Sequence, residues 1–221
     1  MTLGELLAPE RVPQSLTDVK ISAIARNIER VTQGSLFVIT KKHIHEGTQL
    51  AHQALKAGAA AVVTQEDLQL EQQVLVEDTA ESYAKLCSAW FGHPAQKLKL
   101  LGVTGTNGKT TVTHMLKGIL EQAGHRCGLV GTIGNETGKS ALEAHNTTPD
   151  AFELHSLFAR MVEEGCEYAV MEVSSHALDQ GRVAGLTFEA GVFTNLTQDH
   201  LDYHKTMQNY LLAKRKLFEQ S

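Results

Sequence analysis

Residues 100–116 read Leu-Leu-Gly-Val-Thr-Gly-Thr-Asn-Gly-Lys-Thr-Thr-Val-Thr-His-Met-Leu, and the rest of the chain can be interpreted around them. An apolar run suited to a buried strand comes first, and a turn of glycine, threonine and asparagine follows it. Apolar side chains then recur at helical spacing, at Val112, Met115, Leu116 and Ile119. This order predicts a strand, a loop and a helix.

The loop has the composition of a phosphate-binding site. Glycines at 102, 105 and 108 let the backbone approach a ligand, and the amides of the loop and first helical turn converge on one place. Lys109 can reach the outer phosphates of a nucleotide, and the Thr110 hydroxyl can bind Mg²⁺. A glycine-rich turn without a ligand is the alternative, but such a turn does not need Lys-Thr-Thr after its last glycine.

The spacing differs from the common P-loop pattern, which has four residues between its first glycine and the Gly-Lys pair. Five residues lie between Gly102 and Gly108. The stretch 105–111 is therefore interpreted as a variant P-loop, and its expected nucleotide-binding residues are Gly105, Thr106, Asn107, Gly108, Lys109, Thr110 and Thr111.

Bulk composition excludes several classes of protein. The formal net charge of −5 and the lack of a Lys/Arg block argue against a nucleic-acid partner. No apolar run reaches the roughly 18 residues of a membrane span, and the N-terminus lacks the basic start of a signal peptide. We therefore expect a cytoplasmic protein without membrane insertion. Cys87, Cys127 and Cys166 are interpreted as small core residues rather than disulfide partners or metal ligands.

Two α/β domains are expected, at 1–97 and 98–221. The first alternates strands and helices, and Pro94 within the breaker 92–96 marks its end. Asp78 or Thr79 can cap its last helix. Its expected strands are 19–25, 34–39, 59–64 and 74–78, and its expected helices are 48–56 and 79–91.

The second domain is expected to be an incomplete, mainly parallel, doubly wound P-loop ATPase domain. Polar residues cluster after three of its strands, at 104–107, 172–176 and 195–200. In an open parallel sheet this carboxyl edge is where ligands bind. The expected strands are 99–104, 126–130, 167–173 and 190–195, and the helices lie near 109–123, 151–164 and 206–219.

Two of these clusters carry candidate magnesium ligands. Glu172 ends the apolar run 168–171, and a carboxylate at that point can hold the magnesium of a bound nucleotide. A helix N-cap or a surface glutamate is the plain alternative. His200 lies in Asn-Leu-Thr-Gln-Asp-His-Leu-Asp at 195–202, where Asp199 and Asp202 can orient it or hold the next helix start. A lone histidine would be interpreted as a core residue, but not beside Glu172 and Thr110.

Three further segments offer polar groups. Residues 146–150, Asn-Thr-Thr-Pro-Asp, are either a plain helix start or a turn whose hydroxyls bind something. Residues 174–182 offer hydroxyls, an amide and Arg182, which can pair with an anionic second substrate. No nucleophilic triad is implied. Composition alone favours a solvated helix lysine for Lys214.

Together these motifs resemble the Mur ligases of peptidoglycan synthesis. The residues that carry the resemblance are Thr-Gly-Thr-Asn-Gly-Lys-Thr-Thr at 104–111, Glu-Val-Ser-Ser at 172–175 and Asp-His-Leu-Asp at 199–202, in the family's order. Asn-Thr-Thr-Pro at 146–149 and the run 172–183 are most similar to the MurE type, which adds the third amino acid. Folylpolyglutamate synthetases share the Thr-Asn-Gly-Lys loop but usually lack Thr-Thr and Ser-Ser-His-Ala.

The resemblance implies an ATP- and Mg²⁺-dependent ligase of cell-wall synthesis, and hence of cell shape and division. ATP would phosphorylate the terminal carboxylate of UDP-MurNAc-L-Ala-D-Glu, and an amino acid's amine would attack the acyl phosphate. By position, the implied catalytic residues are Lys109, Glu172, His200 and Lys214. The implied magnesium ligands are Thr110, Glu172, His200 and Lys214 as a carbamate. The implied substrate-binding residues are Asn146, Thr147, Thr148, Ser174, Gln180 and Arg182.

Two departures from the family leave other functions open. Asn-Ile-Glu-Arg at 27–30 stands where the family usually has Asp-Ser-Arg, which bears on uridine recognition. The family also carries further strands and a third domain beyond the segment that ends at Ser221, so we expect these residues alone to be inactive without a C-terminal region or a partner chain. A non-catalytic paralogue that senses nucleotide or muramoyl peptide, and a related ligase for another acidic substrate, are the alternatives.

Overall fold

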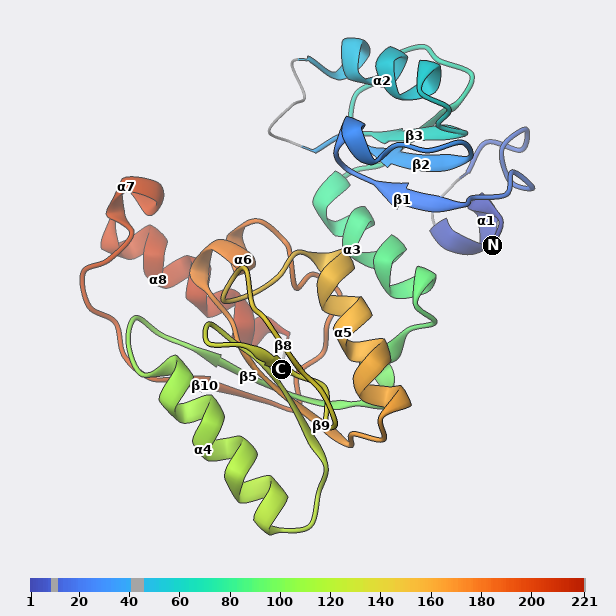
Figure 1. Ribbon diagram of the computed structural model, residues 1–221. Helices are drawn as coiled ribbons and strands as arrows, with labels where there is room; N and C mark the ends of the chain where they lie inside the picture. Colours follow the sequence, from blue (N-terminus) through green and yellow to red (C-terminus); the bar gives the residue numbers. More distant parts are fainter. Residues whose placement is uncertain (9–11, 41–45, 221) are drawn as a thin grey trace. The chain divides into compact units, whose positions relative to one another are not determined.

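The computed structural model describes residues 1–8, 12–40 and 46–220. The chain forms two compact units, Met1–Trp90 and Phe91–Ser221 (Figure 1). The boundary expected after Lys97 therefore lies inside the second unit. Pro94 does not act as a linker, because it begins the 3₁₀ helix η3 (Pro94–Lys97), which packs against the second unit's own helix α5. None of the described helices is long and apolar enough to span a membrane.

The first unit contains a parallel sheet in the order β1-β2-β3-β4. Strands β2 and β3 are buried along their whole length, as expected for a parallel sheet with covered faces. The bounds of the strands are β1 (Ala23–Ala25), β2 (Ser35–Val38), β3 (Ala61–Thr64) and β4 (Gln73–Leu75). Its helices are α1 (Leu3–Leu7), η1 (Ile28–Arg30), α2 (Gly47–Lys56) and α3 (Thr79–Trp90).

Side-chain caps begin helices α1 and α3 of this unit. The Asp78 carboxylate accepts hydrogen bonds from the backbone amides of Ala80 and Glu81, so Asp78 is the residue that caps α3. Helix α1 was not expected, because its five residues are too few to show a helical period. A capping box between Thr2 and Glu5 fixes its first turn.

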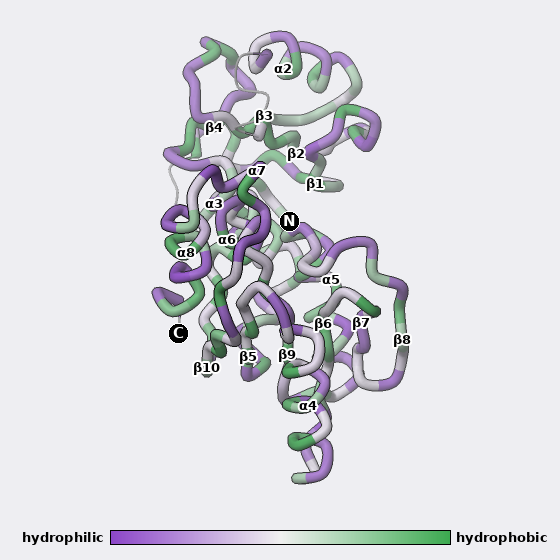
Figure 2. The backbone as a smooth tube through the Cα atoms, turned by 90° about the vertical axis from the view of Figure 1, so that its left-hand side faces the viewer, coloured by the Kyte–Doolittle hydropathy of each residue, from purple (hydrophilic) through white to green (hydrophobic). Residues whose placement is uncertain are grey.

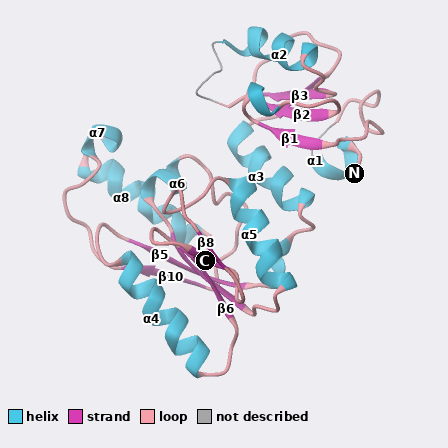
Figure 3. Cartoon of the chain, viewed as in Figure 1, coloured by secondary structure: helices cyan, strands magenta, loops and turns pink. Residues whose placement is uncertain are grey.

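The second unit contains the larger sheet, in the order β10-β5-β9-β6-β7-β8. Strands β10, β5, β9 and β6 are parallel, and the short strands β7 and β8 extend the sheet with antiparallel pairing. Figure 3 shows strands of this sheet in magenta between helices. The expected mainly parallel α/β fold is confirmed. The strand bounds are β5 (Lys99–Thr104), β6 (Cys127–Val130), β7 (Asn135–Glu136), β8 (Ala141–Leu142), β9 (Tyr168–Glu172) and β10 (Ala190–Phe193).

Helices cover both faces of this sheet (Figure 1). On one face, α4 packs Val112, Leu116 and Leu120 on a buried strand cluster, and Figure 2 shows hydrophilic and hydrophobic segments alternating along this helix. On the other face, the α5 side chains Phe158 and Met161 enter the larger core. The helix bounds are α4 (Lys109–Gln122), α5 (Ala151–Glu163), α6 (Ser175–Asp179), α7 (Leu201–His204), α8 (Met207–Arg215) and the 3₁₀ helix η4 (Lys216–Glu219).

Core packing explains Gly102 and the three cysteines. A Cβ atom at Gly102 would lie 2.8 Å from Leu217 Cδ1 and 2.9 Å from Phe188 Cδ1, so this glycine admits two core side chains. The expectation that it lets a ligand approach is wrong, because Gly102 lies within β5 rather than at its end. The cysteines are free and buried, which confirms their interpretation as core residues.

Candidate functional site

The loop 105–111 consists of the turn that follows β5 and the first residues of α4. Gly105 and Gly108 both have positive φ angles, +144° and +84°. A Cβ atom at Gly105 would lie 1.9 Å from Thr194 Oγ1, whereas no described atom lies within 4 Å of a Cβ at Gly108. The loop is therefore held on one side and open on the other, which suits a bulky anionic ligand above the helix start.

The end of β10 fixes this loop in place. The backbone amide of Asn107 donates to Asn195 Oδ1 at 3.1 Å, and the Asn195 side-chain amide donates back to the Asn107 carbonyl at 3.1 Å. The amide of Thr106 donates to the Asn195 carbonyl at 2.9 Å. Within the predicted nucleotide-binding set, Asn107 therefore serves to hold the loop against Asn195. Its own backbone N–H is already hydrogen-bonded.

Lys109 lies over the loop rather than extending into solvent. Its ammonium donates to the carbonyls of Gly105 and Thr106 at 3.0 and 2.9 Å. Burial lowers the pKa of Lys109, and the negative charges of Glu172 and Asp199 partly offset that shift. The predicted phosphate-binding lysine is therefore held at the loop by backbone oxygens that an incoming phosphate can replace as its partner.

Glu172 is buried at the carboxyl end of β9, with 1% of its surface exposed. Its Oε1 accepts from the Thr110 hydroxyl at 3.0 Å and from the backbone amide of Thr132 at 2.9 Å. Its Oε2 accepts from the Thr132 hydroxyl at 3.2 Å. The surface and helix-cap interpretations are both wrong, because the residue is enclosed and Ser174 is the one that caps α6.

Lys214 is also buried, with 1% of its surface exposed, so the solvated interpretation is wrong. Its ammonium donates to the Gly105 carbonyl at 2.7 Å and lies 4.4 Å from the centre of the Tyr210 ring. Burial, with a smaller contribution from the Lys109 charge, lowers the pKa of Lys214 to about 8. A larger neutral fraction follows, and the neutral amine is the form that reacts with CO₂ to give a carbamate.

Four of the six predicted substrate residues form one hydrogen-bonded network beside Glu172. The Thr148 hydroxyl donates to the Glu172 carbonyl at 2.8 Å and accepts from the Ser174 amide at 3.0 Å. Arg182 donates to the Thr148 carbonyl at 2.8 Å and to Gln180 Oε1 at 2.8 Å. The buried Thr148 hydroxyl therefore serves the fold, whereas the more exposed members of the set can reach a ligand. The neighbouring residues Asn146 and Thr147 lie on the turn before α5, whose cap is Asp150.

His200 is half-exposed, in contrast to the core interpretation. It has a positive φ of +51°, its ring stacks edge-on with His176 at 4.8 Å between centroids, and its Nε2 lies 3.5 Å from Asp199 Oδ2. The described residues contain no group of three or more His, Cys, Asp or Glu placed to hold a metal. Of the predicted magnesium ligands, only Glu172 and His200 are of these residue types, so the predicted set is too small to count as such a group. It stays a prediction.

The contact between Thr110 and Glu172 fits a hard cation. Their oxygens lie 3.0 Å apart at the start of α4, and Mg²⁺ prefers a small number of such oxygen ligands together with nucleotide phosphates. When bound there, Mg²⁺ would neutralise phosphate charge during transfer. This chain's own contribution is to hold the two oxygens together at the loop.

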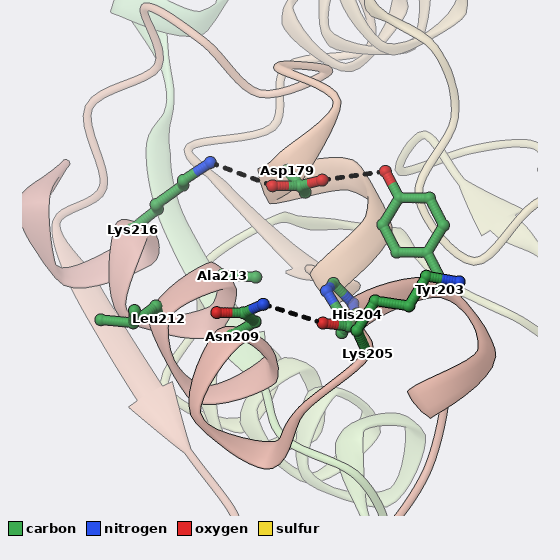
Figure 4. A pocket seen from close by; sticks show the side chains of 8 residues that line it. All are labelled: Asp179, Tyr203, His204, Lys205, Asn209, Leu212, Ala213 and Lys216. Carbon is green, nitrogen blue, oxygen red and sulfur yellow. Dashed lines mark hydrogen bonds and ion pairs between the residues drawn. The ribbon is translucent and has the colours of Figure 1, made fainter.

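A separate cavity of about 360 Å³ lies between α6, α7 and α8 (Figure 4). Asp179 accepts from the Tyr203 hydroxyl at 2.9 Å and from the Lys216 ammonium at 3.3 Å. The Lys205 ammonium donates to the Asp202 carbonyl. Its lining residues are Asp179, Tyr203, His204, Lys205, Asn209, Leu212, Ala213 and Lys216. None of the predicted site residues lines it.

Sequence reasoning missed Thr132, which makes two hydrogen bonds to Glu172. Gly131 alone separates Thr132 from the end of β6, so Thr132 lies at the same carboxyl edge of the sheet as the other clusters. The rule that located the clusters after β5, β9 and β10 applies equally to β6. A search for polar residues after every parallel strand would therefore have found it.

A family model of the Mur ligase middle domain matches residues 103–221, more than half of the chain. The chain belongs to the Mur ligase family. This Mur ligase chain is 47% identical to the UDP-N-acetylmuramoyl-L-alanyl-D-glutamate--2,6-diaminopimelate ligase of Parabacteroides distasonis, over 99% of the chain and 46% of the relative. The ligase of the same name from Clostridium perfringens is also 47% identical, over 91% of the chain and 42% of the relative.

A solved structure of a ligase with this name matches the whole Mur ligase chain. Its TM-score is 0.82 at 28% sequence identity, and the match covers 100% of this chain and 45% of the other. The chain therefore spans less than half the length of the relatives that it matches. The family resemblance that the loop and strand-end motifs indicated is confirmed.

Proposed function

We propose that this chain is the N-terminal and partial central portion of a MurE-type ligase. The whole enzyme would join a third amino acid to UDP-N-acetylmuramoyl-L-alanyl-D-glutamate, using ATP and Mg²⁺. Relatives at 47% identity carry the name of such a ligase, with 2,6-diaminopimelate as the amino acid, and support this reaction class. A cytoplasmic location follows, because the nucleotide-linked substrate and ATP are cytoplasmic molecules.

The contact of Thr110 with Glu172 at the loop is the observation that best supports this proposal. It joins the loop 105–111 to a buried carboxylate at the carboxyl end of the neighbouring strand β9. A plain glycine-rich turn has no need of a buried charge beside its first helical turn, since burying a carboxylate without a purpose is unfavourable. A bound magnesium–nucleotide complex would use both Thr110 and Glu172 as metal ligands.

The side chains can be assigned roles in this reaction. Lys109 binds the outer phosphates as a point charge, while Thr110 and Glu172 hold the metal. His200 and carbamylated Lys214 complete the magnesium set, since a carbamate replaces a repelling cation with an anion. Exposed groups of the substrate set orient the terminal carboxylate that ATP phosphorylates, and the amine then displaces phosphate from the acyl phosphate.

Titration of the 221-residue chain with Mg²⁺ and ADP, followed by two-dimensional NMR, tests the nucleotide site. We expect weak binding that shifts the amide signals of residues 105–111, and we expect Lys109→Ala to abolish these shifts. The variant Lys117→Ala is the matched control, since Lys117 lies on the same helix and pairs with Glu121 and Glu136. Unchanged signals in the native chain at saturating nucleotide would contradict the proposal.

Ligation by these residues alone is not expected. The relatives are more than twice as long as the part that matches, and the amino-acid site is proposed to lie in that further region or in a partner chain. Purified chain should therefore form no tripeptide product from UDP-MurNAc-dipeptide, ATP and diaminopimelate or lysine. Robust product formation would overturn this part of the proposal.

A non-catalytic paralogue is the second candidate, and the segment 27–30 favours it. Asn27 caps the 3₁₀ helix η1 by accepting from the Glu29 amide at 3.1 Å, so its side chain already has a structural task. Determining the coding sequence beyond codon 221 separates the two candidates. An open frame with an amino-acid-binding domain supports the ligase, and a stop codon supports the paralogue.

A further inference from the structure

Thr132 touches both halves of the candidate site. Its hydroxyl oxygen lies 3.2 Å from Glu172 Oε2 and 2.9 Å from the hydroxyl oxygen of Thr147. Glu172 belongs to the proposed metal set, and Thr147 belongs to the proposed substrate set. A single side chain after β6 therefore joins groups that were assigned to different ligands.

The backbone at this point is shaped to hold the carboxylate. Thr132 supplies two of the three hydrogen bonds that described residues make to the side chain of Glu172, and Thr110 supplies the third. A Cβ atom at Gly131 would lie only 2.6 Å from Glu172 Oε1, so the close approach requires glycine. Because Glu172 is fully buried, these bonds determine where its oxygens point.

The chemistry of the three groups gives the hydrogen bonds a direction. A hydroxyl has one proton to donate and can accept with its lone pairs, whereas a carboxylate can only accept. The Thr132 hydroxyl is placed to donate to Thr147 Oγ1 and to Glu172 Oε2, so its one proton serves only one of the two oxygens at a time. Thr147 and Glu172 therefore compete for the same proton, and strengthening one contact weakens the other.

We propose that Thr132 is a positioning residue that couples the muramoyl-peptide side of the site to the magnesium-nucleotide side. A substrate group that donates to Thr147 in place of Thr132 frees the Thr132 proton for Glu172. That change alters how firmly Thr132 holds the carboxylate that faces the metal. The inference rests on the proposed function, because it requires both ligands to bind at the assigned residues.

The variant Thr132→Val tests this coupling. Valine has nearly the same shape and keeps the backbone amide that donates to Glu172 Oε1, so only the hydroxyl is removed. Mg²⁺-ADP affinity is measured by NMR titration of the 221-residue chain, with and without UDP-MurNAc-dipeptide. We expect the native affinity to change at least about fivefold when the dipeptide is present, and this factor to fall to about one in the variant.

The variant should also raise the Mg²⁺ concentration for half-maximal ADP binding about tenfold, the effect of losing one hydrogen bond to a charged group. Thr132→Ser, which keeps a hydroxyl, should restore both the coupling and the Mg²⁺ requirement. Thr137→Val is the control, because it removes a different threonine hydroxyl, bonded to Glu164, from the same segment. This control should leave both quantities unchanged.

The outcomes separate the two proposals. If the native chain binds neither Mg²⁺-ADP nor the dipeptide, the proposed function fails and the coupling fails with it. If the native chain binds both ligands but Thr132→Val keeps native coupling, only the role of Thr132 is overturned. The same conclusion follows if Thr132→Ser behaves like valine, or if Thr137→Val reproduces the loss of coupling.

Discussion

Glu172 and Lys214 show what individual residues contribute to this site. Each is a charged side chain with 1% of its surface exposed. The Glu172 carboxylate accepts from the Thr110 hydroxyl, and the Lys214 ammonium donates to the Gly105 carbonyl. Buried charges without such partners are strongly unfavourable, so their retention points to a task other than stability. Both residues can be selected from the sequence by motif position, but burial, which excludes their plain interpretations, appears only in the folded chain.

Glycine substitutions in and near the loop should differ sharply. Gly105→Ala places a methyl group against Thr194 at a positive φ angle, and we expect it to lower the free energy of unfolding by at least about 2 kcal/mol. Gly108→Ala meets no described atom and should lower it by about 1 kcal/mol, from backbone strain alone. Gly118→Ala, within α4 and in open space, should raise it by roughly 0.5–1 kcal/mol. Urea denaturation measures all three, and equal effects at 105 and 108 would contradict the clash.

His155 should make the stability of the chain depend on pH. It is 2% exposed in α5, its Nδ1 has no hydrogen-bond partner among the described atoms, and burial lowers its pKa to about 4. Since the folded pKa lies below the usual value of 6.5, the contribution is complete above pH 6.5 and is lost as pH falls toward 4. The loss attributable to this group is about 3 kcal/mol.

His155→Leu provides the comparison for this pH dependence. The unfolding free energies of the native chain and of the variant are measured by denaturant titration at several values between pH 4 and 7. The variant should keep more of its stability at the acid end, because leucine has no proton to gain. Parallel pH profiles for the two proteins would show that His155 does not titrate as expected.

At the scale of elements, the long strands and helices of the second unit are predictable, and the short ones are not. Strand β5 has the predicted bounds, because its apolar run and glycine-rich turn are both strong local signals. The hairpin of β7 and β8 has two residues per strand, too few for any alternation to show. The predicted helix 206–219 ends at Arg215 and continues as a 3₁₀ turn, which places Leu217 in the core.

The short length of β6 explains why Thr132 is harder to select from the sequence than Glu172. Glu172 closes an apolar strand and is followed by a serine pair, so its context is distinctive. Thr132 follows a short strand and lies in a run of glycine and small polar residues that resembles an ordinary turn. Its significance comes from the pairing of β6 with β9, a contact between segments some forty residues apart.

The Tyr210 hydroxyl of helix α8 contacts the loop, in addition to the bond from Lys214 to Gly105. The Tyr210 hydroxyl, on a buried ring, lies 3.2 Å from Thr106 Oγ1, and burial raises the pKa of Tyr210. Tyr210→Phe should lower the unfolding free energy by about 1 kcal/mol and weaken ADP binding, because the loop loses a contact. Tyr203→Phe removes an exposed tyrosine hydroxyl that bonds to Asp179, and should change ADP binding little. Equal losses in ADP binding for the two variants would contradict this role for Tyr210.

At the scale of the whole molecule, each unit has its own parallel sheet and its own hydrophobic cluster. The candidate site residues after Lys97 all belong to the second unit, which is also the part that the family model matches. The order of the strands cannot be obtained from local patterns, because β5 pairs with β9 and β10, which are distant in sequence. The carboxyl-edge rule nevertheless places their polar ends together without knowledge of that order.

The two borders of the larger sheet differ in how they meet solvent. At one border stands the two-residue strand β8, and at the other stands β10, where Phe193 is 40% exposed. A longer border strand with an exposed aromatic side chain is a template for pairing with another chain. We expect concentrated solutions of the 221-residue chain to contain dimers or larger species, and Phe193→Lys to shift them toward monomer in size-exclusion chromatography with light scattering.

Ile119→Lys is the matched control, because it places the same charge at an exposed apolar position on α4, away from any strand border. It should leave the distribution of species unchanged, and an equal shift would attribute the association to general hydrophobicity. The difference between the two borders therefore predicts which border of the sheet pairs with another chain. At high protein concentration, a strand of another chain would pair with β10, whereas the border formed by β8 would not pair.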